Sequence, residues 1–139
     1  MNQAYAGDIS PKEAWALLAA DARAALVDVR TPAEWTYVGI PDLTPLARKP
    51  VLVPWVDFPN MQPNERFVDE VGRALKPGAP VVLICRSGAR SRAAAIALTA
   101  AGFGPCYNVV SGFEGDPDPL RHRGTVSGWK VEGLPWVQT

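Results

Sequence analysis

The sequence is poor in the residues that build disulfide frameworks, metal sites and histidine-dependent catalytic centres. Its 139 residues include two cysteines, Cys85 and Cys106, and one histidine, His122. Two cysteines without a Cys-x-x-Cys spacing exclude a disulfide framework and predict neither a dithiol redox site nor a metal site. One histidine leaves little for a Ser-His or Cys-His catalytic pair. We therefore expect no metal and no cofactor.

The sequence also lacks an excess of charge and any long apolar run. Lys plus Arg and Asp plus Glu both number 14, so we expect neither nucleic acid nor a membrane as a partner. The first residues have no basic segment followed by an apolar core and predict no signal peptide. No apolar run approaches the ~20 residues that a membrane-spanning helix needs. A reducing, cytoplasmic location is the expectation.

Helix and strand signals alternate along the chain. Capping boxes at Ser10 and Thr31 mark two helix starts, and apolar or alanine-rich patterns predict helices over 64–75 and 91–101, the latter ended by Gly102. Apolar, β-branched runs predict strands over 24–29, 51–53 with 55–56, 81–84 and 106–110. Such alternation predicts an α/β fold, with a parallel sheet covered by helices on both faces.

A thiol lies between the clearest strand and a helix. Residues 81–84 are all apolar, as in a buried parallel strand, and Cys85 follows at the carboxyl end, where α/β proteins bind ligands. A loop containing Gly88 can direct backbone N–H groups at the sulfur, and the helix dipole also favours an anion there. Arg86 and Arg90 add positive charge. We predict that Cys85 reacts as a thiolate without a histidine base.

Such a thiolate can attack the outer sulfur of thiosulfate and become a persulfide. Arg86 or Arg90 would then hold the leaving sulfonate, although Arg90 and Ser91 could instead orient the loop. Asp28, at the end of an apolar strand, could pair with Arg30 or with a loop arginine. Cys106 lies in a predicted strand without basic neighbours, and core packing is the favoured interpretation.

Several segments together resemble the rhodanese family. Residues 26–30 with Glu34 and Trp35 resemble its first signature, 85–91 its active-site loop, and 107–109 with 112–113 the strand and turn that follow. Residues 128–130 and 134–136 resemble the ending of bacterial single-domain members. Gly39 departs from the family, which often has a histidine there, but that histidine is not catalytic in the family.

The resemblance implies a rhodanese-like fold with a five-stranded parallel core sheet and helices on both faces. It implies one rhodanese domain over residues 8–139, preceded by an extension over 1–7 and ending in an irregular Gly/Pro/Trp-rich tail over 111–139 that packs on the domain. The implied activity is that of a thiosulfate sulfurtransferase, a rhodanese-type enzyme. It takes sulfane sulfur from thiosulfate or another persulfide donor and passes it to a thiol or cyanide acceptor, with a protein as a possible donor or acceptor.

The site residues divide by expected role. The sequence assigns Cys85 to catalysis, five loop residues to substrate binding, and three residues to structural support; the binding residues are Arg86, Ser87, Gly88, Ala89 and Arg90, and the supporting ones are Asp28, Arg30 and Ser91.

Two other functions compete with this one. A non-enzymatic sulfur carrier or interaction module, which receives persulfide from a partner protein, would need the same loop. Related domains that are phosphatases or arsenate reductases use Cys-x₅-Arg, but here Ser91 stands six places after Cys85 and Arg90 comes one place early. The loop is therefore sized for a sulfur atom rather than a tetrahedral anion.

Overall fold

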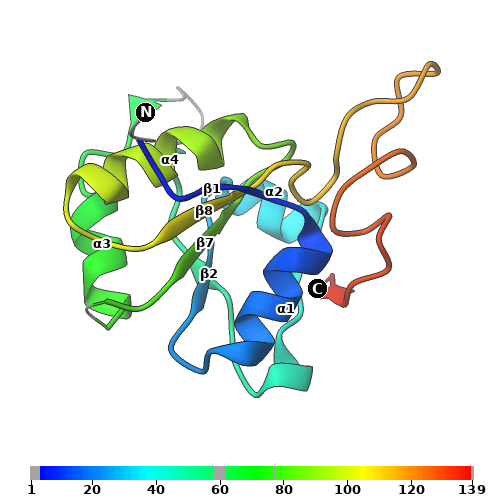
Figure 1. Cartoon of the computed structure of the whole chain (residues 1–139). Coiled ribbons are helices and arrows are strands. Elements are labelled where there is room, and N and C mark those ends of the chain that lie inside the picture. The colour runs from blue at the N-terminus through cyan, green and yellow to red at the C-terminus, as the bar shows by residue number, and fades with distance from the viewer. Residues whose placement is uncertain (1–3, 58–61, 77, 139) are drawn as a thin grey trace.

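A parallel five-stranded sheet forms the centre of the domain in the computed structural model, which describes residues 4–57, 62–76 and 78–138 (Figure 1). Its strand order is β1-β8-β7-β2-β4. The strands are β1 (Gly7–Ile9), β2 (Ala25–Asp28), β4 (Val51–Leu52), β7 (Val81–Ile84) and β8 (Cys106–Val109). The structure confirms the predicted α/β fold with a parallel sheet.

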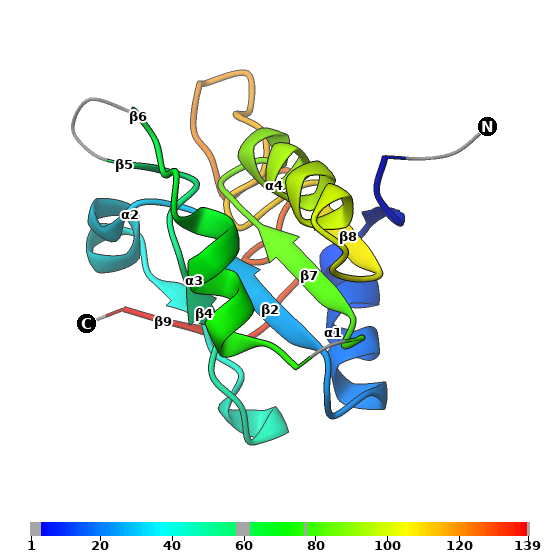
Figure 2. The same ribbon diagram turned by 90° about the vertical axis from the view of Figure 1, so that its left-hand side faces the viewer.

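Helices cover both faces of this sheet (Figure 2). On one face, α3 (Phe67–Ala74) and α4 (Ala89–Ala100) pack their apolar side chains, such as Phe67 and Leu98, against Val27 and Leu83. On the other face, α1 (Pro11–Ala20) and the C-terminal tail pack against Leu26 and Val82. A short helix, α2 (Pro32–Tyr37), follows β2. Burial of these two apolar clusters is the main force that holds the layers together.

The predicted helix starts are partly right. Ser10 and Thr31 each form a complete capping box, before α1 and α2 respectively. The predicted start at Ser91 is wrong, because α4 begins at Ala89 with Gly88 as its N-cap. Arg90, predicted to lie in the loop, therefore belongs to the first turn of α4 together with Ser91.

The helix predicted from residue 64 begins later than expected, at Phe67. Asn64 instead shapes the preceding turn: its side chain donates to the Pro54 carbonyl at 2.9 Å and accepts from the Arg66 N–H at 3.1 Å. Local hydrogen bonding by asparagine competes with a helical backbone in this way. Pro77, which the sequence suggests as a stop signal, lies outside the described residues.

The sequence signals missed β1, a strand of three residues that pairs with β8. It begins at Gly7, one residue before the predicted domain start at residue 8. The strand predicted around Pro54 is divided: β4 lies at the sheet edge, while β5 (Val56–Asp57) pairs antiparallel with β6 (Gln62–Pro63) in a separate ribbon. Proline lacks the N–H that a continuous central strand would require.

The C-terminal tail folds back on the domain. Trp129 is fully buried and its indole N–H donates to the Pro135 carbonyl at 2.7 Å. Farther along, β9 (Trp136–Val137) pairs antiparallel with β3 (Ile40–Pro41), and the short 3₁₀ helix η1 (Thr44–Leu46) follows β3. In Figure 1 the orange part of the tail projects away from the sheet. Within the described part of the chain, every helix is too short or too polar to cross a membrane.

Candidate active site

Cys85 lies directly after β7, at the carboxyl edge of the sheet. Its side chain is 1% exposed. The Gly88 backbone N–H donates to Cys85 Sγ at 3.1 Å, and Ser91 Oγ lies 3.2 Å from the same sulfur. The tight loop and the first turn of α4 thus bring polar groups to the thiol, as the sequence predicts for this edge.

Two glycines permit the curvature of this loop. Gly88 has φ +114°, and a Cβ there would lie 2.3 Å from the Val110 carbonyl oxygen. Gly112 has φ +67°, and a Cβ there would lie 2.6 Å from the Cys85 carbonyl oxygen. Only glycine adopts such conformations at no steric cost and allows this approach of two backbones.

The turn that follows β8 holds the loop through its carbonyl groups. The Phe113 N–H donates to the Cys85 carbonyl at 2.8 Å, and the N–H groups of Glu114 and Gly115 both donate to the Arg86 carbonyl. With its carbonyls satisfied from outside, the loop is free to direct N–H groups such as that of Gly88 toward the sulfur.

Arg90 is held by an acid from another element. Its guanidinium forms two hydrogen bonds with the Glu34 carboxylate of α2, at 2.7 and 3.0 Å. Burial raises the pKa of Glu34, but the hydrogen bonds and charge of Arg90 outweigh it and bring that pKa below its usual value. The hydrogen bonds that Arg90 donates to the Glu34 carboxylate raise the pKa of Arg90. Of the two roles considered for Arg90, this geometry favours orientation of the loop.

The other loop residues differ in exposure. Arg86 and Ala89 are exposed, while Ser87 is half-buried. Arg86 follows Cys85 directly in the sequence, and among the described residues it takes part in no ion pair. Contact of these residues with a substrate stays a prediction.

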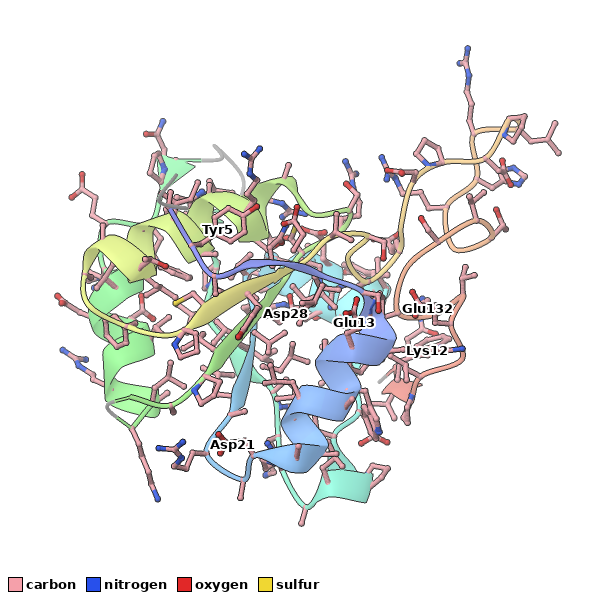
Figure 3. All side chains as sticks on the ribbon, in the orientation of Figure 1. Tyr5, Lys12, Glu13, Asp21, Asp28 and Glu132 are labelled. Carbon is pink, nitrogen blue, oxygen red and sulfur yellow. The ribbon has the colours of Figure 1, made fainter. Side chains whose placement is uncertain are left out.

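Asp28 pairs with Arg30, one of the two partners considered for it. The two side chains are fully buried and their closest N–O distance is 2.6 Å; Figure 3 shows Asp28 in the interior of the molecule. Arg30 also donates to the Gly39 carbonyl at 2.8 Å, and its guanidinium lies 4.4 Å from the centre of the Phe113 ring. The pair therefore supports the turn that holds the Cys85 loop.

A further polar side chain reaches this site from β8. Asn108 is 2% exposed, and its Oδ1 lies 2.5 Å from Ser91 Oγ. Its Nδ2 donates to Asp8 of β1 at 3.0 Å. Neither Asn108 nor Asp8 is among the site residues predicted from the sequence, although an asparagine within an apolar strand signals a polar group that needs a buried partner.

The remaining candidates lie elsewhere. Cys106 begins β8 and pairs in register with Val81, so it lies at the opposite end of the sheet from Cys85. Burial raises the pKa of its thiol, which suits core packing. His122 is exposed in the tail. Across residues 4–57, 62–76 and 78–138, no cluster of three or more His, Cys, Asp or Glu side chains could hold a metal.

Comparisons with known proteins agree with this geometry. The family model described as the STR4 middle domain matches residues 6–139. A thiosulfate sulfurtransferase of Actinobacillus pleuropneumoniae is 30% identical over 128 residues, which cover 92% of this chain and 90% of that protein. The chain belongs to the STR4 middle-domain family, within the rhodaneses. Its function therefore lies in sulfur transfer.

Other similar proteins match nearly the whole length of this rhodanese. The crystal structure of Rv0390 from M. tuberculosis has a TM-score of 0.90 and 49% identity, over 97% of this chain and 99% of that one. A polysulfide-sulfur transferase homodimer from Wolinella succinogenes has a TM-score of 0.62 and 25% identity, over 98% and 80%. An uncharacterized protein of Rickettsia conorii is 37% identical over 93% of this chain and 95% of its own length.

Proposed function

We propose that this rhodanese is a thiosulfate sulfurtransferase that carries sulfane sulfur as a persulfide on Cys85. The observation that carries the proposal is the position of Cys85 Sγ, at the carboxyl edge of the sheet, 3.1 Å from the Gly88 N–H and beside the exposed Arg86. The 30% identity to a thiosulfate sulfurtransferase supports thiosulfate as the donor.

The proposed reaction has two displacement steps. The Cys85 thiolate attacks the outer sulfur of thiosulfate, the S–S bond of thiosulfate breaks, and sulfite leaves with the bonding electron pair. The product Cys85–S–S⁻ keeps one negative charge. A thiolate or cyanide acceptor then attacks the outer sulfur and releases the Cys85 thiolate. No proton has to move between protein groups in either step, which suits a site built without histidine.

Individual loop residues have separate tasks in this proposal. Arg86 binds the sulfonate of thiosulfate, since it is the exposed arginine beside the thiol, whereas Arg90 is paired with Glu34. The backbone at Ser87, Gly88 and Ala89 surrounds the transferred sulfur at the start of α4, where the helix dipole favours an anion.

We also propose that one domain suffices, as in bacterial single-domain members. In support, the chain covers 90% of the length of the Actinobacillus enzyme. A polysulfide is a second donor class, because the Wolinella protein of similar fold is a polysulfide-sulfur transferase. A carrier that accepts sulfur only from a partner protein would fail with both small donors.

Intact-protein mass spectrometry tests the proposal. Incubation with thiosulfate should add one sulfur atom, and cyanide should remove it as thiocyanate. Cys85→Ser should not be labelled, whereas the matched variant Cys106→Ser, at the other end of the sheet, should be labelled like the wild type. Sulfur that appears equally in Cys85→Ser would disprove the persulfide site. Labelling by polysulfide or a protein persulfide alone would keep Cys85 as carrier and reject thiosulfate as donor.

A further inference from the structure

A chain of hydrogen bonds leads from the exposed edge strand of the sheet to the buried sulfur of Cys85. Asp8 on β1 accepts from Asn108 Nδ2 at 3.0 Å, and Asn108 Oδ1 lies 2.5 Å from Ser91 Oγ. Ser91 Oγ in turn lies 3.2 Å from Cys85 Sγ. Asn108 and Ser91 are both buried, at 2% and 0% exposure, so water cannot replace either of them, whereas Asp8 is exposed.

The chemistry of each group fixes where the protons lie. An ionised carboxylate can only accept hydrogen bonds, so Asp8 requires the amide nitrogen of Asn108 to face it. The amide oxygen of Asn108 must then face Ser91. Because an amide oxygen carries no proton, the hydrogen between these two oxygens is the single hydroxyl proton of Ser91.

This arrangement leaves Ser91 with only lone pairs toward the sulfur. We propose that Asn108, held in one orientation by Asp8, is a positioning residue that keeps the Ser91 proton away from Cys85 Sγ. Whenever Cys85 is a thiol, the Ser91 hydroxyl accepts the hydrogen of that thiol. An anionic Sγ would face those lone pairs, and rotation of the hydroxyl toward it would leave two acceptor oxygens 2.5 Å apart.

The proposal rests on the proposed persulfide function for its consequence. In a persulfide the inner sulfur carries no proton and the charge lies on the outer sulfur, beyond Ser91. The Asn108–Ser91 pair therefore tolerates the loaded form and disfavours the free thiolate. Transfer to an acceptor, which regenerates the thiolate, is the step that this network slows.

Other charged groups near Cys85 do not supply this effect. They lie on several elements and partly cancel each other, since Arg90 is paired with Glu34 and Arg30 with Asp28. The titratable groups on β1, β2, α2, α4, β8 and the segments that follow β2 and β7 are Asp8, Asp28, Arg30, Glu34, Tyr37, Arg86, Arg90, Arg92, Cys106 and Tyr107. Asn108 is neutral, so replacing it changes the hydrogen bond of Ser91 without changing the charge.

The test is the alkylation of Cys85 by iodoacetamide, in a Cys106→Ser background and without any sulfur donor. Asn108→Leu keeps the branched shape of the side chain but removes its polar atoms, and so frees the Ser91 proton to donate to the sulfur anion. Alkylation at neutral pH should become roughly tenfold faster, as expected for one added hydrogen bond to a charged group. The pH profile should move to lower pH, and its plateau should fall slightly because a hydrogen-bonded thiolate is a weaker nucleophile; easier access to the sulfur would instead raise the plateau.

A double-mutant comparison isolates the route of the effect. With Ser91→Ala in place, Asn108→Leu should no longer accelerate alkylation, because the hydroxyl through which it acts is gone. An unchanged or slower rate in Asn108→Leu, or an equal acceleration with and without Ser91, would overturn the proposal.

If Asn108→Leu does not fold, the exposed Asp8→Asn serves instead, since it lets the Asn108 amide turn over. Asp8→Asn also removes a negative charge. Any change in the alkylation rate caused by that charge would persist with Ser91→Ala in place, whereas the acceleration that acts through the Ser91 hydroxyl would disappear. Again, equal acceleration in both backgrounds would refute the role of Asn108. Because alkylation needs no sulfur transfer, these results do not depend on whether the proposed function is right.

Discussion

Replacement of Glu34 by glutamine should destabilise the protein through the loop that carries Cys85. The Glu34–Arg90 pair joins α2 to the first turn of α4 with two hydrogen bonds, and each side chain is 21% exposed. Glutamine can still accept the Thr31 N–H of the capping box, but its amide nitrogen cannot accept from Arg90. The variant therefore removes the ion pair and retains the helix cap.

The magnitude follows from the partial burial of the pair. Exposed pairs contribute about 0.2–1 kcal/mol, and breaking a buried one costs about 3–5 kcal/mol. Loss of this half-buried pair should lower the free energy of unfolding by about 1–2 kcal/mol at neutral pH. That corresponds to a fall in Tm of roughly 3–8 °C for a domain of this size. Urea unfolding and thermal melts measure this difference.

The pH dependence gives a second check with a definite sign. Arg90 holds the pKa of Glu34 below its ordinary value of 4.5 in the folded protein. A carboxyl group of this kind stabilises the fold above its unfolded pKa, and that contribution is lost as the pH falls through the folded pKa. The gap between wild type and Glu34→Gln should therefore be full at neutral pH and close in acid.

Glu65→Gln is the matched control, because Glu65 is exposed and forms no ion pair among the described residues. It should change stability little at any pH. If Glu34→Gln is as stable as the wild type at neutral pH, or if the gap persists in acid, the ion pair does not hold the loop as described.

Three further changes separate recognition, core packing and backbone geometry. Arg86→Ala should lower kcat/KM for thiosulfate roughly ten- to a hundredfold and affect a neutral persulfide donor less, because a hydrogen bond to the charged sulfonate is lost; equal losses would assign Arg86 to loop shape. Cys106→Ser should keep its activity but lose about 1–3 kcal/mol on urea unfolding, since the buried site receives a hydroxyl; lost activity in a folded variant would implicate the second thiol. Gly88→Ala should abolish labelling by thiosulfate, because the new Cβ would clash with the Val110 carbonyl. The control Gly124→Ala, where φ is positive but no atom lies near the added Cβ, should retain labelling. Full activity in Gly88→Ala would show that the loop can adopt another shape.

Local signals in the sequence determined much of this protein. The capping boxes at Ser10 and Thr31 are made by residues three positions apart, so their pattern is visible in the chain itself. The apolar run of β7, with Cys85 directly after it, specified a buried strand that delivers a thiol to the carboxyl edge of a sheet. The rhodanese resemblance supplied the five-stranded count, which the strand signals alone did not reach.

Only the tertiary structure decided which polar groups surround the sulfur. Glu34 and Arg90 are 56 residues apart, and Asp8 and Asn108 are 100 residues apart. β1 has three residues, too few for a periodic pattern, and it is defined by its pairing with β8. Partners of this kind are set by strand order and register, which depend on how the whole core packs. The sequence therefore identified Cys85 as the candidate nucleophile, but the fold determined that Glu34 holds Arg90 and that Asn108 lies against Ser91.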